Sequence, residues 1–319
     1  MNKAGATRAD SGRFSGAVGE PAPLALDQTI TIGRSRLQHG KASDRVYLMA
    51  ADDEDMPGLL TVIEELAAAH RYGKIFAKVP ARWGQACTAA GYRVEAKVPG
   101  FYQGREDGLF LGKYLQPHRA ELSDRAAIER TLDLCRQATP KDPGAGSSGP
   151  GSPAAAAQGS GKSKPPAYRL GLCAPADCAA MAALFRQVFP SYPFPVHDPG
   201  FLRRSMSEEV SYAAAWHQEQ IAALASAEYS AAASHAEMTD FATLPEHRRR
   251  QLAGRLLAAL EQEMQNQGIK LAYTIARAVS VGINLTFARA GYQYAGTLIN
   301  NTQICGRIES MNVWYRLLQ

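Results

Sequence analysis

Hydrophobic positions follow two different periods along the chain, and together they predict both strands and helices. Short apolar runs bounded by turn residues are typical of strands, whereas apolar residues at every third or fourth position are typical of helices. The helical period is clearest over 250–267, where one face carries Leu252, Leu256, Leu260 and Met264. Gly268 follows this segment and is the kind of residue that ends a helix.

The same patterns divide the chain into alternating elements. In a predicted N-terminal domain, 26–139, we expect strands over 29–33, 45–50, 74–79, 93–98 and 108–114, and helices that end at Ala67, Ala90 and Gln137. In a second domain, 167–319, we expect strands over 168–173, 210–216, 221–229, 235–243, 270–276, 292–298 and 311–317, and helices over 175–189, 250–267 and 280–290. This order predicts an α/β (α+β) fold, with a mixed sheet flanked by helices.

Composition shifts mark the borders of the two domains. Residues 1–25 have no hydrophobic period, and we expect a disordered tail there. Residues 140–166 are nearly all Pro, Gly, Ser, Ala and Lys, which is typical of a flexible linker. The strand–helix–strand unit from Gly73 to Ala96 is similar to that from Gly268 to Gly296. This similarity predicts two copies of a related fold, one on each side of the linker.

Charge, cysteine content and hydropathy argue against several classes of protein. The chain has 319 residues, a net charge of +5 and 46% hydrophobic residues, which are ordinary values for a globular protein. No nucleic-acid-binding signature accompanies the positive charge, so we expect no nucleic-acid partner. The sequence has no signal peptide and no apolar run long enough to span a membrane, and its five cysteines form no CxxC pair. We expect a cytoplasmic protein without a membrane or metal partner.

The most informative segment, 237–257, reads as a strand, a basic turn and the start of a helix. The turn holds Arg248, Arg249 and Arg250 directly before the amphipathic helix. The first N–H groups of a helix lack partners, and the helix dipole makes this end positive. Such a turn is therefore a ready site for a phosphate or pyrophosphate.

The segment 248–253 resembles the Arg/Gln-x-x-Gly-x-Gly/Ala pattern of the Gcn5-related N-acetyltransferase (GNAT) superfamily. Arg248 and Ala253 match this pattern, whereas Gln251 stands where the family usually has glycine. We expect helical backbone angles at Gln251, which glutamine can adopt. The block from Asn284 to Tyr292 is similar to a second family element, which lines the pantetheine and thiol end of acetyl-CoA. The resemblance implies a GNAT domain that uses acetyl-CoA, preceded by a degenerate GNAT-like domain without the pyrophosphate turn.

A closer resemblance is to the β-lysine N-acetyltransferases of bacteria and methanogenic archaea. The segments that carry it cover 28–116 and 168–316 and include 73–80, 236–245, 272–277, 296–302 and 308–315. The resemblance implies transfer of the acetyl group to the terminal amine of L-β-lysine, which gives N6-acetyl-β-lysine, a compatible solute used in osmoprotection. Two alternatives stay open: an acetyltransferase for another small amine or a protein lysine, and a non-catalytic acyl-CoA-binding module.

The proposed reaction requires a base, because a lysine-type amine must lose a proton at a cost of about 4.6 kcal/mol at pH 7. Glu237 lies eleven positions before Arg248, the offset of the catalytic glutamate in the histone-acetylating branch, and the resemblance implies that it is the base. Strand alternation places Asp240 on the opposite face, where it is a second candidate for binding the ammonium group. The other interpretation is that Glu237 and Asp240 only form structural pairs with nearby Lys, Arg or backbone groups. Phe287 occupies the position of the usual tyrosine acid, so Tyr292 and Tyr294 are candidates in its place. Core packing is the other interpretation of both tyrosines, and water is then the proton donor to the thiolate.

The remaining candidate residues lie beside the turn and in the second block. For acetyl-CoA we expect contacts from Phe241, Ala242, Thr243, Arg248, Arg249, Arg250, Gln251, Leu252, Ala253, Gly254, Asn284 and Phe287. Helix capping is the alternative role of Asn284. For the carboxylate of the acceptor we expect Arg277 at a strand end, or Asn300 and Asn301 in the loop that follows. We expect a small-molecule amine as partner, and the sequence leaves a homodimer open.

Overall fold

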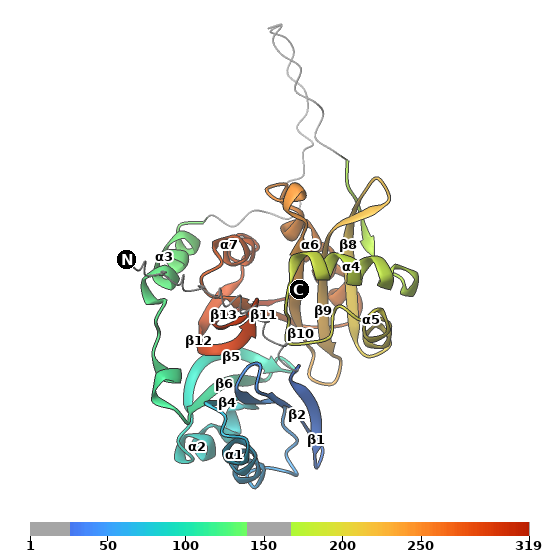
Figure 1. The fold of residues 1–319 in the computed structure, drawn as a ribbon. Coiled ribbons are helices and arrows are strands. Elements are labelled where there is room, and N and C mark those ends of the chain that lie inside the picture. Colours follow the sequence, from blue (N-terminus) through green and yellow to red (C-terminus); the bar gives the residue numbers. More distant parts are fainter. Residues whose placement is uncertain (1–25, 139–166, 319) are drawn as a thin grey trace, which may run out of the picture.

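The computed structural model describes residues 26–138 and 167–318, which form a single sheet of 13 strands with helices packed against it (Figure 1). The predicted tail, 1–25, and the predicted linker, 140–166, lie outside the described residues. Within the described ranges, no helix is both long and apolar enough to cross a membrane.

The strands of the two chain halves occupy separate parts of the sheet, in the order β1-β2-β3-β4-β6-β5-β12-β13-β11-β10-β9-β8-β7. The N-terminal half holds β1 (Gln28–Ile32), β2 (Ser35–Gly40), β3 (Arg45–Ala50), β4 (Lys74–Pro80), β5 (Arg93–Tyr102) and β6 (Glu106–Tyr114). The C-terminal half holds β7 (Arg169–Leu172), β8 (Val210–His217), β9 (Gln220–Ser230), β10 (His235–Thr243), β11 (Leu271–Arg277), β12 (Gln293–Ile304) and β13 (Arg307–Leu317).

Helices connect the parallel strands and cover the sheet. They are α1 (Leu59–Ala69), α2 (Gly84–Ala89), α3 (Arg125–Arg136), α4 (Cys178–Val188), α5 (Pro199–Met206), α6 (Leu252–Asn266) and α7 (Val281–Arg289). Although α3 belongs to the N-terminal half, it crosses over and packs beside α7 (Figure 1).

Both halves repeat one strand arrangement. In the N-terminal half, β3 and β4 are parallel and connected through α1, while β6 and then β5 add antiparallel strands. In the C-terminal half, β10 and β11 are parallel and connected through α6, while β13 and then β12 add antiparallel strands. The structure thus has the mixed sheet flanked by helices that the sequence predicts.

The two halves meet where β5 pairs with β12 through Ala96 and Gly296. These two residues are equivalent positions of the sequence repeat, as expected for halves related by an approximate two-fold axis. Gly296 has a φ of +152°, and a Cβ atom there would lie 2.1 Å from the carbonyl oxygen of Glu95. Only glycine therefore allows the two strands to approach this closely.

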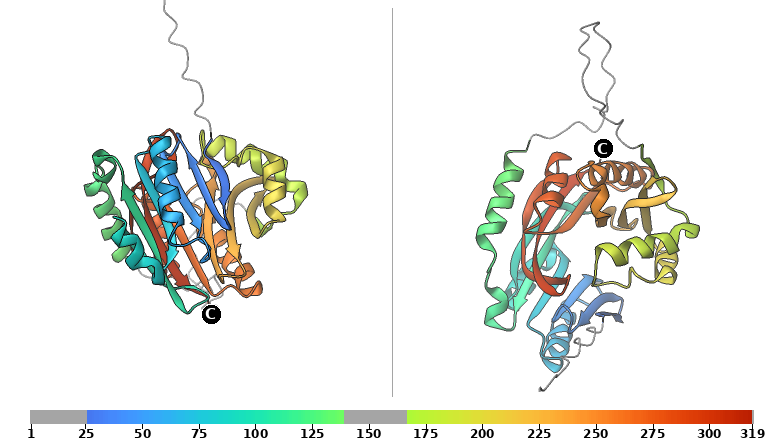
Figure 2. Two further views of the ribbon diagram at one scale, coloured as in Figure 1. Left: turned by 90° about the horizontal axis from the view of Figure 1, so that it is seen from below. Right: turned by 45° about the horizontal axis from the view of Figure 1, so that its top comes forward.

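The strands of both halves share a core, which gives the sheet an inner face. Side chains of N-terminal strands, among them Tyr47, Phe76 and Phe110, pack against Tyr273 and Val313 of C-terminal strands. Figure 2 shows these strands between the outer helices. On the opposite face, α6 and α7 cover β8 to β11, whereas α4 and α5 cover the inner face near β8 and β9.

Three elements differ from the sequence prediction. Helix α5 was not expected, although Asp198 caps it by accepting hydrogen bonds from the Gly200 and Phe201 N–H groups. An additional strand, β2, lies between the expected strands 29–33 and 45–50. Strands β12 and β13 form a long hairpin, so Asn300 and Asn301 lie within β12 and not in a loop.

Candidate functional site

Strands β10 and β11 begin side by side and then separate. Their parallel pairing covers only 235–237 and 271–273, although β10 continues to Thr243 and β11 to Arg277. Beyond Glu237, the β10 backbone groups that point toward β11 have no strand to pair with. Because such groups require hydrogen bonds, this opening can take the amide groups of an extended ligand.

A β-bulge in β10 decides which side chains share the inner face. The register with β9 shifts between Thr239 and Ala242, and Asp240 has a φ of +54°. Glu237 lies opposite Glu228 of β9, and Asp240 accepts a hydrogen bond from Ser226, two residues before Glu228. Asp240 therefore lies on the same face as Glu237. The prediction that it lies on the opposite face is wrong, because the bulge interrupts the alternation of the strand.

Glu228, Glu237 and Asp240 form what we call the carboxylate cluster. The Tyr192 hydroxyl donates to Asp240 Oδ1 at 2.6 Å, and Ser226 Oγ donates to Oδ2 at 2.7 Å. Burial raises the pKa of Asp240, and burial beside the charges of Asp240 and Glu237 raises the pKa of Glu228 to about 8. Carboxylates brought together in this way favour binding of a cationic group, which would relieve their mutual repulsion.

The N-terminal half contributes Lys78 to this cluster. Lys78 Nζ donates to the Tyr273 hydroxyl at 2.9 Å, and that hydroxyl donates to Glu237 Oε2 at 2.8 Å. Nζ itself lies 3.9 Å from Glu237 Oε2 and 5.4 Å from the centre of the Tyr47 ring. The Glu237 side chain remains 19% exposed. These contacts orient Glu237 without burying it.

Sequence reasoning gave no role to Lys78, Tyr273, Tyr192 or Glu228. Lys78 and Tyr273 lie in segments that support the resemblance, 73–80 and 272–277, but they come together only because the two halves pack face to face. Glu228 could have been found as the cross-strand neighbour of Glu237, since 221–229 and 235–243 read as consecutive strands.

The basic turn before α6 has the features of an anion site. Arg249 and Gln251 have φ values of +62° and +58°, and Leu252 starts the helix. The N–H groups of 249–254 donate to no described residue, whereas Arg255 N donates to the Gln251 carbonyl at 3.2 Å. The expectation of helical angles at Gln251 is wrong, because this residue takes the left-handed conformation that explains the glycine of the family pattern.

All hydrogen-bonding positions of the Asn284 side-chain amide are occupied by partners within the protein. Its Nδ2 donates to the carbonyls of Arg277 and Ser280, at 2.9 and 2.8 Å. Its Oδ1 accepts from Asn312 Nδ2 at 2.9 Å and from Trp314 Nε1 at 2.8 Å. These four bonds occupy both donors and both acceptor positions of the amide. The geometry therefore favours the structural alternative for Asn284 over a bond to the cofactor.

The aromatic candidates lie in the core beneath α6 and α7. The Phe287 ring is buried between Phe241, at 5.5 Å, and Tyr292, at 4.9 Å between ring centroids. Burial raises the pKa of Tyr292, so its phenol stays protonated. This core is on the face of the sheet opposite Glu237, and the structure does not bring Tyr292 to the carboxylate cluster.

Of the three candidates for binding the acceptor carboxylate, Arg277 and Asn300 are bonded to other groups of the protein. Arg277 Nη2 donates to Glu309 Oε1 at 2.7 Å, so its charge is balanced by a buried carboxylate. Asn300 Nδ2 donates to the carbonyls of Arg119 and Glu121. Asn301 differs, because its Oδ1 is buried and has no hydrogen-bond partner among the described residues.

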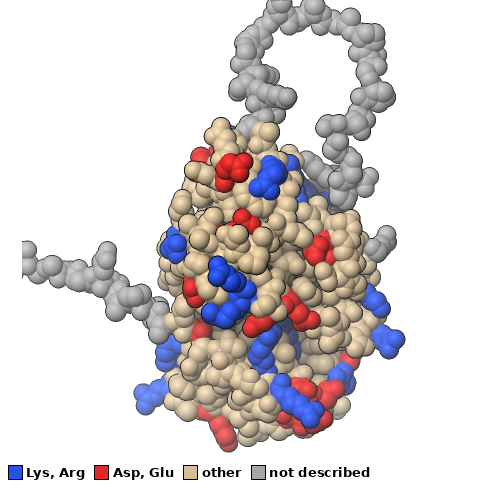
Figure 3. Space-filling view, turned by 90° about the vertical axis from the view of Figure 1, so that its right-hand side faces the viewer, with Lys and Arg blue, Asp and Glu red and all other residues tan. Residues whose placement is uncertain are grey.

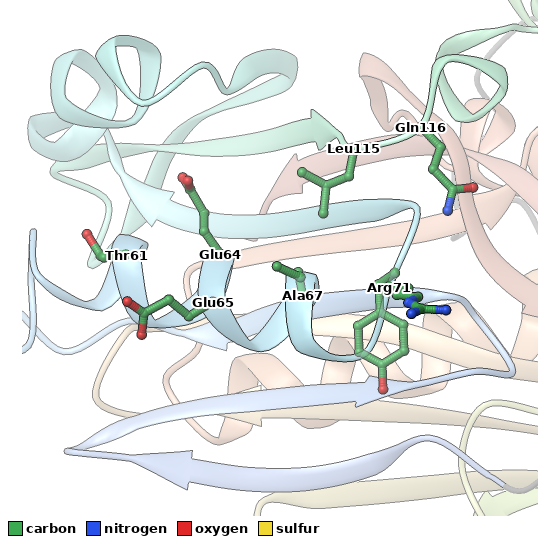
Figure 4. Close-up of a pocket in the computed structure, with 9 residues that line it drawn as sticks. Thr61, Glu64, Glu65, Ala67, Arg71, Leu115 and Gln116 are labelled. Atoms are coloured by element: carbon green, nitrogen blue, oxygen red, sulfur yellow. The ribbon is translucent and has the colours of Figure 1, made fainter.

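Elsewhere on the described surface, the structure has a groove and a mixed distribution of charge. A groove of about 560 Å³ runs along α1 and is lined by residues including Glu64, Arg71 and Leu115 (Figure 4), but it lies away from the carboxylate cluster. On the face shown in Figure 3, acidic and basic side chains are interspersed. Among the described residues, no group of three or more His, Cys, Asp and Glu side chains could hold a metal ion.

Comparison with known sequences relates the chain to acetyltransferases. Residues 179–291 match the model of the acetyltransferase (GNAT) family. The chain is 29% identical over 297 residues to the β-lysine N(6)-acetyltransferase of Methanococcus maripaludis, which covers 92% of the chain and 99% of that protein. It is 30% identical over 271 residues to the β-lysine N(6)-acetyltransferase of Methanosarcina mazei, which covers 83% of the chain and 97% of that protein.

Comparison with solved structures gives more distant similarities. The ribosomal-protein-S18-alanine N-acetyltransferase of Escherichia coli is 15% identical and covers 48% of this chain and 95% of its own, with a TM-score of 0.42. A mutant form of the spermidine N-acetyltransferase SpeG of Vibrio cholerae is 18% identical and covers 47% of this chain and 94% of its own, with a TM-score of 0.40.

Proposed function

Since this chain belongs to the GNAT family and to its β-lysine N(6)-acetyltransferase branch, and is thus an acetyl-CoA-dependent N-acetyltransferase, we propose that its acceptor is the terminal amine of L-β-lysine. The observation that carries this proposal is the similarity to two β-lysine N(6)-acetyltransferases over nearly their whole length. The carboxylate cluster supports it, because the terminal amine of β-lysine arrives as an ammonium group, which such a cluster would attract. The product would be N6-acetyl-β-lysine, and its use would be that of a compatible solute.

In the proposed reaction, the amine nitrogen attacks the thioester carbonyl carbon of acetyl-CoA. A C–N bond forms, the C–S bond breaks, and coenzyme A leaves as a thiolate that takes up a proton. Glu237 accepts the proton of the attacking amine, because it lies where β10 and β11 separate and its carboxylate is held by Tyr273. Water is the proton donor to the thiolate in this proposal, since Tyr292 lies on the other face of the sheet.

The basic turn would position the cofactor. The unpaired N–H groups of 249–254, at the positive end of α6, suit the pyrophosphate of acetyl-CoA. The pantetheine arm would then extend along the free edge of β10, past Phe241, Ala242 and Thr243, toward Glu237. In this arrangement the thioester reaches the point at which the two strands separate. The cofactor and the amine would meet there.

The test is turnover by the full chain with acetyl-CoA and β-lysine. Thiol release should depend on both substrates, and mass spectrometry with NMR should locate the acetyl group on the terminal nitrogen. Absence of turnover with β-lysine at high enzyme concentration, together with turnover of a different amine, would overturn the proposed acceptor. Binding of acetyl-CoA without turnover of any amine in a broad panel would favour the non-catalytic module instead.

A further inference from the structure

Arg45, on β3 of the N-terminal half, is a buried arginine without a carboxylate partner. It is only 3% exposed, and among the described residues no carboxylate lies within 4.0 Å of its guanidinium group. Buried charges in proteins are normally paired, because an uncompensated one is costly. Arg119, equally buried in the same half, follows this rule and pairs with Asp44 at 2.9 Å. The charges of Asp27 and Glu237 act on Arg45 only from a longer distance, so among the described residues its guanidinium group has no carboxylate in direct contact. Such a group can take the carboxylate of a ligand.

The surroundings of Arg45 leave part of its hydrogen-bonding capacity unused. Nη1 donates to the Asn301 carbonyl at 2.6 Å and to Thr302 Oγ1 at 2.8 Å, which fixes the plane of the guanidinium group. Nε is buried and has no partner among the described residues. Burial lowers the pKa of Arg45 to about 10, so the side chain still carries its charge at neutral pH. The orienting bonds come from β12, so both halves form this position.

Arg45 faces the same interior as the carboxylate cluster. Its guanidinium group lies 4.9 Å from the centre of the Tyr47 ring, and Lys78 Nζ lies 5.4 Å from the same ring. Lys78 in turn lies 3.9 Å from Glu237. One tyrosine and one lysine thus lie between the guanidinium group of Arg45 and the carboxylate of Glu237, so a diamino acid that reaches both groups would pass Tyr47 and Lys78.

We propose that Arg45 binds the carboxylate of the acceptor, while the acceptor's terminal amine lies at Glu237. This inference rests on the proposed function and adds that the N-terminal half makes the enzyme selective for amino acids over simple diamines. Next to Arg45, the Asn301 amide donates to Thr302 Oγ1 at 3.3 Å and leaves its buried Oδ1 free. That oxygen accepts a hydrogen bond from the second ammonium group. Arg277, Asn300 and their partners remain structural.

The experiment compares each amino acid with the diamine that it would become without its carboxyl group. The wild-type chain, R45M and R45K are assayed with β-lysine, lysine and ornithine and with the three matching diamines, and acetyl-CoA affinity is measured by calorimetry. We expect R45M to lower kcat/KM for the amino acids about 100-fold or more, with little change for the diamines or for acetyl-CoA affinity. R45K should recover only part of this loss, because it lacks the planar fork.

R119M is the matched control, because it removes a buried arginine that already has its carboxylate. It should lower the melting temperature and leave the preference for amino acids over diamines unchanged. R45M should lower the melting temperature less than R119M, because R119M breaks a direct ion pair with Asp44 and R45M breaks none among the described residues. The proposal is overturned if R45M reduces turnover of amino acids and diamines equally, or if the wild type prefers diamines. Preference for another carboxylated amine over β-lysine, lost in R45M, would overturn only the proposed acceptor.

Discussion

At the scale of single residues, the carboxylate of Glu237 is held in a fixed orientation and is still accessible from outside. Tyr273 and Lys78 hold one of its oxygens, and the side chain is still 19% exposed. We predict that E237Q lowers kcat about 10²- to 10³-fold and leaves acetyl-CoA affinity unchanged, because the amide cannot accept the proton of the amine. Single-turnover kinetics at several pH values and calorimetric titration with acetyl-CoA measure both effects.

A control for this variant is E261Q, which changes a buried glutamate of α6 that pairs with Arg316 at 3.3 Å. It should reduce the free energy of unfolding without changing the pH profile of kcat. A wild-type kcat in E237Q would show that Glu237 does not take the proton. Structural pairing would then be the remaining interpretation of this carboxylate.

Glu228 should make the stability of the protein depend on pH. Its pKa is raised from 4.5 to about 8 in the folded state, because it is buried beside Asp240 and Glu237. Between these values Glu228 binds more protons in the folded protein than in the unfolded chain, so its contribution to the free energy of unfolding falls as the pH rises. We predict that E228Q flattens this slope and stabilises the protein by at least about 1 kcal/mol near pH 8. Urea unfolding at about pH 5 and about pH 8 measures it, and equal slopes in both proteins would contradict the prediction.

At the scale of elements, the contact between β5 and β12 depends on one glycine. A methyl group at Gly296 would collide with the Glu95 carbonyl, whereas one at Gly282 in α7 would meet no atom within 4 Å. We predict that G296A destabilises the protein by more than about 2 kcal/mol, because the collision involves backbone. G282A should instead stabilise it by about 0.5–1 kcal/mol, since alanine favours a helix. Chemical unfolding of both variants tests this, and a G296A protein as stable as wild type would contradict the close approach.

The elements also show how far a sequence can predict this structure. The spacing of Leu252, Leu256, Leu260 and Met264 predicted α6, because a helical period is a local property. The bulge in β10 could not be predicted in this way, since it is a register shift relative to β9. One extra residue there moved Asp240 to the inner face. The left-handed backbone angles of Gln251 could not be predicted from the sequence either, because the turn before α6 imposes them.

At the scale of the whole molecule, the sequence repeat corresponds to related strand–helix–strand units in the two halves of one sheet. It could not show that the halves face each other, because their direct strand contact is a single registered pair, Gly296 with Ala96. That contact brings Lys78 to Glu237 and Arg45 to β12. The C-terminal half therefore supplies only part of the candidate site, and the N-terminal half supplies the rest.

This arrangement predicts that the C-terminal half does not work alone. Without its partner it would expose Tyr273, Leu298, Met311 and Val313, which are buried in the shared core, and an apolar patch of this kind promotes aggregation. We predict that 151–319 produced alone is aggregated and inactive, whereas co-production with 1–150 restores a soluble, active complex, because the cut lies in the predicted linker. Size-exclusion chromatography and the acetylation assay measure both properties. A G296A change in the C-terminal piece should prevent assembly, and a soluble C-terminal piece with full activity would show that the shared core is dispensable.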